Sequence, residues 1–157
     1  MRIFGRKFSP GQILTAAAVF VGGSLLGVGL FTFGFANGWA YLGSDPATCA
    51  QCHIMEDWHE SWQRGSHANV ATCNDCHMPH TNVAEKYVVK GILGFNHAYK
   101  FTTGRHPENL EASDLSKRVI QDACIYCHGD MVSEIHITRT SGEEVSCARC
   151  HADVGHL

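Results

Sequence analysis

Residues Ile13–Ala36 read ILTAAAVFVGGSLLGVGLFTFGFA, an apolar run of 24 residues near the start of a 157-residue chain. No charged residue occurs between Phe8 and Ser44. A helix needs roughly 20 apolar residues to cross the hydrocarbon core of a bilayer, and it satisfies its own backbone hydrogen bonds there. The stretch therefore predicts a transmembrane anchor helix over residues 13–36, preceded by a short tail over residues 1–12.

The charges around this run predict its orientation. Arg2, Arg6 and Lys7 precede it, and residues 1–44 contain no acidic residue. Because basic residues next to a span stay on the cytoplasmic side, we expect a cytoplasmic tail, a single pass through the inner membrane, and a periplasmic domain over residues 37–157. A cleaved signal peptide is the alternative, but its apolar region is normally about 7–15 residues long.

The overall composition is that of a folded protein with an unusual content of metal-binding residues. Hydrophobic residues make up 45% of the chain and charged residues 17%, which excludes intrinsic disorder. The formal net charge of −3 offers no basic surface for nucleic acid. Eight Cys and eleven His in so short a chain indicate disulfides, zinc or haem.

All eight cysteines fall in Cys-x-x-Cys-His motifs. The four motifs are Cys49-Ala-Gln-Cys52-His53, Cys73-Asn-Asp-Cys76-His77, Cys124-Ile-Tyr-Cys127-His128 and Cys147-Ala-Arg-Cys150-His151. This spacing is the attachment signature of c-type haem, in which two thiols bind one porphyrin and the adjacent His can bind the iron. Zinc and disulfides are the alternatives, but neither requires a His directly after every pair. We therefore predict four covalently bound haems c.

Four haems strongly constrain the fold. Residues 46–157 provide only 28 residues for each haem, too few for a conventional core of side chains. We expect a mainly α fold with extensive loops, in which the porphyrins form the core of one compact multihaem cytochrome c domain. Helical pieces are predicted at Met55–Gln63, Val83–Gly91 and Asp114–Ala123, the last with Ser113 as its N-cap. The two early and two late motifs further suggest two dihaem halves.

Each low-spin iron needs a second strong-field ligand, which His or Met can supply. Met55 stands just after the first motif, in the sequence Cys-His-Ile-Met. We expect His59 and His106 to lie on the surface or in loops, and His80 to be either a ligand or a packing residue near the second haem. The histidines outside the motifs are His59, His67, His80, His97, His106, His136 and His156.

The layout resembles the NapC/NirT family of membrane-anchored tetrahaem quinol dehydrogenases over nearly the full chain. The resemblance is carried by the anchor, the four motifs, Cys-His-Ile-Met at the first motif, Ser66-His67 before the second and Pro79-His80 after it. Within the family, Ser66-His67-Ala68-Asn69 ahead of the second motif is most similar to members that serve cytochrome c nitrite reductase.

The resemblance implies a set of iron ligands. It implies that Met55 rather than His53 binds the first iron, and that His67, His136 and His156 take distal positions. Which haem each distal histidine serves stays open. The candidate metal ligands are His53, Met55, His67, His77, His128, His136, His151 and His156.

The resemblance also implies a quinol site beside the first haem. In the family a Lys and an acidic residue seven positions later flank the quinol pocket; here Lys90 matches the Lys and His97 stands at the acidic position. His97 either accepts protons, since imidazole titrates near neutral pH, or binds the first iron in place of Met55. The alternative for Lys90 is a snorkelling interfacial cation. The apolar residues expected to touch lipid and shape the pocket are Val88, Val89, Ile92, Leu93 and Phe95.

These features favour a quinol dehydrogenase that oxidises menaquinol and passes electrons through four haems to a periplasmic multihaem reductase. The expected partner, in an oligomeric complex, is the catalytic subunit of cytochrome c nitrite reductase. A reductase for nitrate or for an N- or S-oxide is the alternative partner. The rival functions are a passive electron-shuttle cytochrome, which the anchor and Lys90 disfavour, and a catalytic multihaem reductase, for which the sequence holds no pocket motif.

Overall fold

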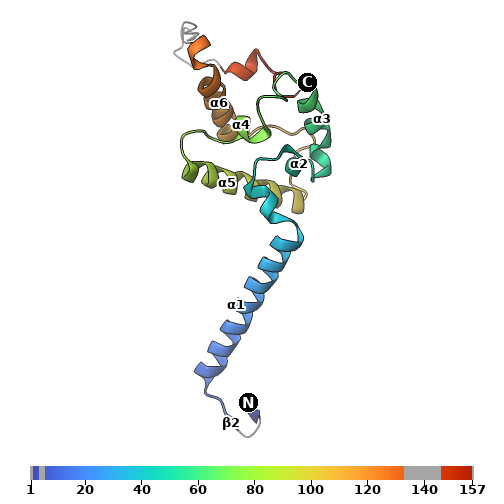
Figure 1. The fold of residues 1–157 in the computed structure, drawn as a ribbon. Coiled ribbons are helices and arrows are strands. Elements are labelled where there is room, and N and C mark those ends of the chain that lie inside the picture. Colours follow the sequence, from blue (N-terminus) through green and yellow to red (C-terminus); the bar gives the residue numbers. More distant parts are fainter. Residues whose placement is uncertain (1, 4–5, 133–145, 157) are drawn as a thin grey trace. The chain divides into compact units, whose positions relative to one another are not determined.

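The computed structural model describes residues 2–3, 6–132 and 146–156 (Figure 1). The chain divides into two compact units, Met1–Gly43 and Ser44–Leu157. Among the described residues the only strands are β1 (Arg2–Ile3) and β2 (Arg6–Lys7), which form a short antiparallel pair. All other regular structure in these ranges is helical, so the prediction of a mainly α fold with extensive loops is confirmed.

Helix α1, Pro10–Phe35, dominates the first unit. It begins slightly before the predicted run because Ser9 and Gln12 form a capping box. The Oγ of Ser9 accepts a hydrogen bond from the Gln12 N–H at 3.3 Å, and the Oε1 of Gln12 accepts one from the Ser9 N–H at 3.0 Å. No residue of α1 is buried, and the helix is long and apolar enough to cross a membrane. It thus has the properties expected of a membrane anchor.

A tight turn follows α1. Asn37 takes a left-handed conformation with φ of 52°, and the 3-10 helix η1, Gly38–Leu42, begins directly after it. Glycine is required at position 38, because a Cβ there would lie 2.4 Å from the ring of Phe33. The Phe33 ring also packs edge-on against Trp39, with centroids 4.9 Å apart.

The second unit consists of short helices joined by loops. Its described elements are α2 (Pro46–Cys49), η2 (His53–Met55), α3 (Glu56–Arg64), α4 (Cys73–His77), α5 (Val83–Thr102), α6 (Asp114–Val132) and η3 (Cys147–Arg149). Helix α3 agrees with its prediction to within one residue at each end. Helices α5 and α6 begin where predicted but extend well beyond their predicted ends.

Buried side chains explain why α5 continues past Gly91. Val89 and Leu93 are buried on either side of that glycine. A helical Gly costs roughly 0.5–1 kcal/mol relative to Ala, whereas full burial of a side chain such as Leu contributes about 1.5–3 kcal/mol. Helix α6 likewise continues through the third motif, anchored by the buried Val119 and Ala123.

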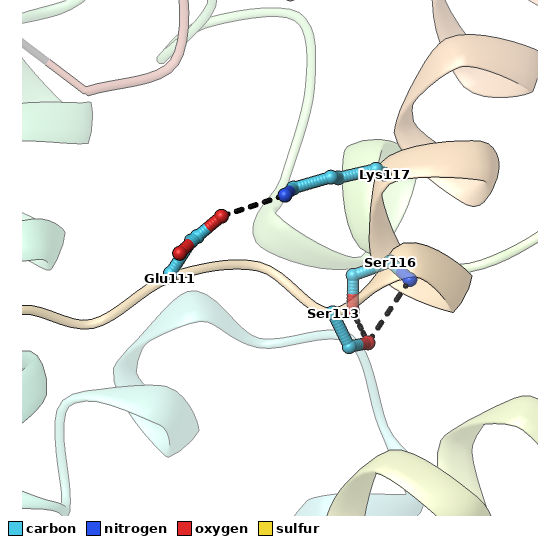
Figure 2. A network of polar contacts seen from close by, with 4 residues as sticks. All are labelled: Glu111, Ser113, Ser116 and Lys117. Carbon is cyan, nitrogen blue, oxygen red and sulfur yellow. Dashed lines mark hydrogen bonds and ion pairs between the residues drawn. The ribbon is translucent and has the colours of Figure 1, made fainter. Parts of the chain in front are cut away.

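Ser113 caps the start of α6, as predicted (Figure 2). Its Oγ accepts a hydrogen bond from the Ser116 N–H at 3.3 Å and lies 3.0 Å from the Ser116 Oγ. Nearby, the Lys117 ammonium donates to Glu111 at 2.7 Å. Both partners of this ion pair are exposed, so the pair contributes little to stability.

The second unit has a small apolar core. Its buried hydrophobic residues among those described are Met78, Val89, Leu93, Val119 and Ala123, each 6–8% exposed. No large side chain in the described residues is fully buried. This is the pattern expected where cofactors fill much of the interior. The main packing joins α4 to α6, so the helices that carry the second and third motifs are in contact. The arrangement of the haems in two dihaem halves stays a prediction.

Candidate functional site

The four motifs lie on short helical elements that fix the spacing of their cysteines. The first motif begins where α2 ends and reaches into η2, the second fills α4, the third lies within α6, and the fourth begins with η3. Asp45 caps α2, since its Oδ1 accepts a hydrogen bond from the Ala47 N–H at 2.9 Å. Each motif therefore presents its pair of thiols from a locally hydrogen-bonded backbone.

Asp75 organises the second motif. Its Oδ2 accepts hydrogen bonds from the N–H of Thr72 at 2.8 Å and from the Thr72 hydroxyl at 2.7 Å. Burial alone would raise the pKa of the Asp75 carboxyl. The Thr72 hydrogen bonds, together with His80 and Lys86, outweigh burial and lower that pKa below its ordinary value.

His80 is held in place by packing next to this motif. Its Nε2 donates to the backbone carbonyl of Asp75 at 2.7 Å, and its ring stacks on Tyr126 with centroids 4.3 Å apart and planes 8° from parallel. With Nε2 engaged in this way, the contacts favour the packing role of His80 over iron ligation.

The cysteines of the first and second motifs are in direct contact. The Cys49 and Cys73 thiols are hydrogen-bonded, and this bond is the main cause that lowers the pKa of Cys49 to about 7. The same bond, followed by burial, raises the pKa of Cys73. Both thiols are unpaired cysteines rather than members of a disulfide.

The other motifs continue this chain of neighbours. Cys76 of the second motif interacts electrostatically with Cys127 of the third, and Cys124 of the third interacts in the same way with Cys147 of the fourth. The elements that bear successive motifs are packed together as well, α2 with α4, α4 with α6, and α6 with η3.

The donor set does not fit a structural zinc site. The described residues include every cysteine and all four motif histidines, and within them no three His, Cys, Asp or Glu side chains converge to hold a metal ion. A structural zinc site almost always needs four such ligands around one point. Eight free cysteines in four pairs, each followed by His, fit thioether attachment of haem instead.

The motif histidines have room for a large cofactor. The side chain of His53 is 94% exposed, and its Nδ1 lies 2.9 Å from the Glu56 carboxylate. His128 and His151 are also exposed, whereas His77 is half-buried. Burial, then the nearby His156 and His97, lower the pKa of His77. A neutral imidazole is the form that binds a metal.

Two motif histidines face a predicted distal histidine. The ring centroids of His67 and His128 lie 6.0 Å apart, and those of His77 and His156 lie 6.2 Å apart. A metal–imidazole bond is about 2 Å long, so two rings on opposite sides of one metal ion have centroids roughly 6 Å apart. Both pairs thus have the separation of two axial ligands of one iron.

His67 and His156, the two predicted distal histidines that the structure describes, each form a hydrogen bond through Nδ1, which leaves Nε2 available to bind a metal. The Nδ1 of His156 lies 3.1 Å from the carbonyl oxygen of Trp58; because a carbonyl only accepts, Nδ1 carries the proton. The Nδ1 of His67 is hydrogen-bonded to the Ser66 hydroxyl at 3.1 Å. Metal-binding histidines commonly use one ring nitrogen for such a bond and the other for the metal.

The remaining candidates are placed differently. Met55 is half-buried in η2, and His136 lies outside the described residues. His106 is exposed, as expected, and its ring packs against Phe101. His59 is half-buried beside Trp62 rather than freely exposed.

Lys90 and His97 occupy the same side of α5, two turns apart. Lys90 is half-buried and interacts with Cys49 of the first motif. Burial, then Lys86, lower the pKa of Lys90, while Cys49 acts in the opposite direction. Desolvation, then Lys100, lower the pKa of His97, and His97 in turn influences His77 of the second motif. The two residues therefore lie beside different motifs.

No sequence pattern indicates the contact between Trp58 and His156. The Trp58 carbonyl accepts a hydrogen bond from His156, which is 98 residues away in the chain, and no local pattern can predict a contact at that distance. The contact of the His53 Nδ1 with the Glu56 carboxylate follows an (i, i+3) spacing and was accessible to sequence reasoning.

Comparison with known proteins identifies the family. Residues 10–157 match the family described as NapC/NirT cytochrome c, N-terminal region. The chain belongs to the NapC/NirT cytochrome c family. This confirms the resemblance inferred from the motifs, and a cytochrome c with eight cysteines in such motifs carries multiple haems c.

Known relatives align with nearly the whole of this chain. The cytochrome c-type protein NrfH of Wolinella succinogenes is 30% identical over 92% of this chain and 87% of its own length. The cytochrome c nitrite reductase subunit NrfH of Nitratidesulfovibrio vulgaris is 34% identical over 87% of this chain and 82% of its own length. A chain in the crystal structure of the cytochrome c nitrite reductase NrfHA complex bound to the inhibitor HQNO is 30% identical with a TM-score of 0.62, covering 88% of this chain and 90% of that one.

Proposed function

We propose that this chain is a membrane-anchored tetrahaem quinol dehydrogenase, which oxidises menaquinol and delivers the electrons to the catalytic subunit of cytochrome c nitrite reductase. One observation carries the proposal: the elements that bear successive motifs pack against one another, α2 with α4, α4 with α6 and α6 with η3, so haems held there would form a continuous path. The choice of partner is supported by the relatives, which are named as NrfH and include a chain solved in an NrfHA complex.

Each motif would hold one haem through its two cysteines. The motif histidine would bind the iron, except in the first motif, where Met55 would take that place. When bound, each haem supplies one-electron exchange at its iron. His156 would complete the ligation of the second haem and His67 that of the third, as the ring separations support. Met55 serves the first iron in this proposal, and His136 the fourth. The cysteine pairs are Cys49 and Cys52, Cys73 and Cys76, Cys124 and Cys127, and Cys147 and Cys150.

Quinol oxidation releases two electrons and two protons, so the site needs proton acceptors as well as a haem. Lys90, beside the first motif, would hydrogen-bond a quinol hydroxyl and take its proton at Nζ. The lowered pKa of Lys90 favours this role because more of the amine is neutral at a given pH. His97, two turns along α5, would accept the second proton.

The exposed side of α5 would give quinol a route from the bilayer. Val88, Ile92, Phe95 and Tyr99 are 61%, 46%, 70% and 44% exposed, and their spacing places them on one face of the helix. In this proposal α1 is retained as the anchor with its N-terminus in the cytoplasm. The motifs then lie in the periplasm. The exposed apolar side chains of α5 would contact the lipid surface.

The test is reduction of the purified, detergent-solubilised protein by a short-chain menaquinol analogue, followed by haem absorbance. We expect rapid reduction of wild type and a loss on the order of 100-fold for Lys90→Ala, within the usual range for a proton-transfer group. Lys117→Ala is the control, because Lys117 is an exposed lysine on α6 paired with Glu111, and this variant should stay close to wild type. Equal, slow reduction of all three proteins would favour a passive shuttle.

A second measurement separates the donor role from catalysis by the chain itself. Adding the purified catalytic subunit of nitrite reductase should couple quinol oxidation to nitrite consumption. Without that subunit, nitrite should not reoxidise the reduced haems. Rapid reoxidation by nitrite alone would instead indicate a catalytic multihaem reductase.

A further inference from the structure

We propose that Trp58 is a positioning residue for His156: it holds the imidazole in the tautomer and the ring plane required to bind the iron of the second haem. The inference rests on the proposed ligation of that iron by His156. It assigns a role to a residue on α3, an element that contributes no cysteine to any motif.

The backbone of Trp58 sets the tautomer. Its carbonyl oxygen accepts a hydrogen bond from the Nδ1 of His156 at 3.1 Å. Because the proton resides on Nδ1, the lone pair of the imidazole is on Nε2. A hydrogen bond from the second ring nitrogen to a carbonyl also raises the basicity of a metal-binding histidine and fixes its orientation.

The side chain of Trp58 sets the ring plane. Its indole and the His156 imidazole are perpendicular, at 88°, with centroids 5.0 Å apart. Such an edge-to-face contact between rings is favourable beyond its area of burial. The His156 ring also lies 6.2 Å from that of His77, with planes 39° apart. The indole of Trp58 therefore packs against the same imidazole that lies near the histidine of the second motif.

Trp58 is 37% exposed and also lines a cleft of about 360 Å³. The other residues lining the cleft are Ile54, Asp57, Glu108, Asn109 and Leu110. Replacing the indole by a methyl group would remove its ring contact with His156, and the imidazole would gain freedom to turn away from the iron.

The test compares four variants of the full-length protein, each first shown by haem content to carry the wild-type complement. Trp58→Ala removes the indole and keeps the carbonyl, and Trp58→Phe keeps a smaller ring. Trp62→Phe is the control on the same helix, because the Trp62 indole instead donates to the Ala71 carbonyl at 3.1 Å. His156→Ala removes the proposed ligand itself.

Three measurements report on the iron rather than on turnover. They are the electron paramagnetic resonance spectrum of the oxidised haems, their redox titration, and carbon monoxide binding to the reduced protein. In Trp58→Ala we expect one low-spin signal to shift or broaden, one reduction potential to change, and one more haem to bind carbon monoxide than in wild type. Trp58→Phe should show a smaller change, and Trp62→Phe should match wild type.

The outcomes separate this inference from the function on which it rests. If His156→Ala changes one haem but Trp58→Ala and Trp58→Phe leave all signals at wild-type values, the role of Trp58 is overturned while His156 remains a ligand. If His156→Ala leaves every haem signal unchanged, His156 is not a ligand and both statements fail. If Trp58→Ala does not take up its haems, the Trp58→Phe spectra decide by the same criteria.

Discussion

The imidazole rings of His67 and His128 lie edge to face, with centroids 6.0 Å apart and planes 77° from parallel. His128 belongs to the third motif, on α6, whereas His67 lies in the loop between α3 and α4. The pair therefore spans two segments that are distant in the chain, as expected if one iron is bound from both sides.

We predict that His67→Ala converts one haem from low-spin to high-spin. Removal of a strong-field ligand leaves that iron with a vacant or water-filled position. The electron paramagnetic resonance spectrum of the oxidised protein should lose one low-spin signal and gain a high-spin signal. His106→Ala is the control, since His106 is an exposed residue packed on Phe101. An unchanged low-spin spectrum in His67→Ala would show that another side chain binds this iron.

The lowered pKa of Lys90 predicts a pH dependence of quinol oxidation. Burial lowers this pKa from its ordinary value, so the neutral amine becomes available at a lower pH than for a free lysine. The rate of haem reduction should therefore rise as pH increases toward the lowered pKa. Arg stays protonated throughout this range, so Lys90→Arg should be slower and its rate should be nearly independent of pH. Parallel pH profiles for the two proteins would exclude Lys90 as a proton acceptor.

The Asp75 cap predicts an acid-sensitive contribution to stability. Its pKa is lowered in the folded protein, so the contribution is present above the ordinary Asp pKa of about 4. It is lost as pH falls through the lowered folded value. At pH 7, Asp75→Asn should reduce the free energy of unfolding by about 1 kcal/mol, the usual magnitude for a lost cap.

Thermal unfolding at pH 7 and at pH 3 tests the direction of this pH dependence. The difference between wild type and Asp75→Asn should shrink at pH 3, because the unfolded chain, with its ordinary Asp pKa, is largely protonated there and the advantage of the charged carboxylate in the folded protein decreases. Glu111→Gln is the control, because the exposed ion pair of Glu111 with Lys117 contributes little. A difference of equal size at both pH values would mean that the charge of Asp75 does not matter.

Local patterns were sufficient to predict the starts of α5 and α6 but not their ends. The capping residue Ser113 and the apolar run in α1 act within a few residues, so they are visible in the sequence. Helix α5 was predicted only as far as Gly91, and glycine usually weakens a helix. Burial of Val89 and Leu93 overrides that preference, and burial is decided by the tertiary fold.

The candidate site shows the same difference between local and tertiary information. Cys-x-x-Cys-His spacing predicts the haem attachment residues from the sequence alone, since thioether chemistry is local. The proximity of His156 to His77, and its contact with Trp58, depends on how the C-terminal segment packs against α3 and α4. The sequence could nominate His67 and His156 as ligands, but only the fold brings each of them near a particular motif histidine.

The central claim is that four haems are covalently bound to this chain, and intact mass spectrometry of the protein purified from membranes tests it most directly. We predict the mass of the chain plus four haems, and the loss of one haem mass when both Cys147 and Cys150 are replaced by Ala. The unmodified chain mass, or fewer than four added haems in the wild-type protein, would contradict the proposed function.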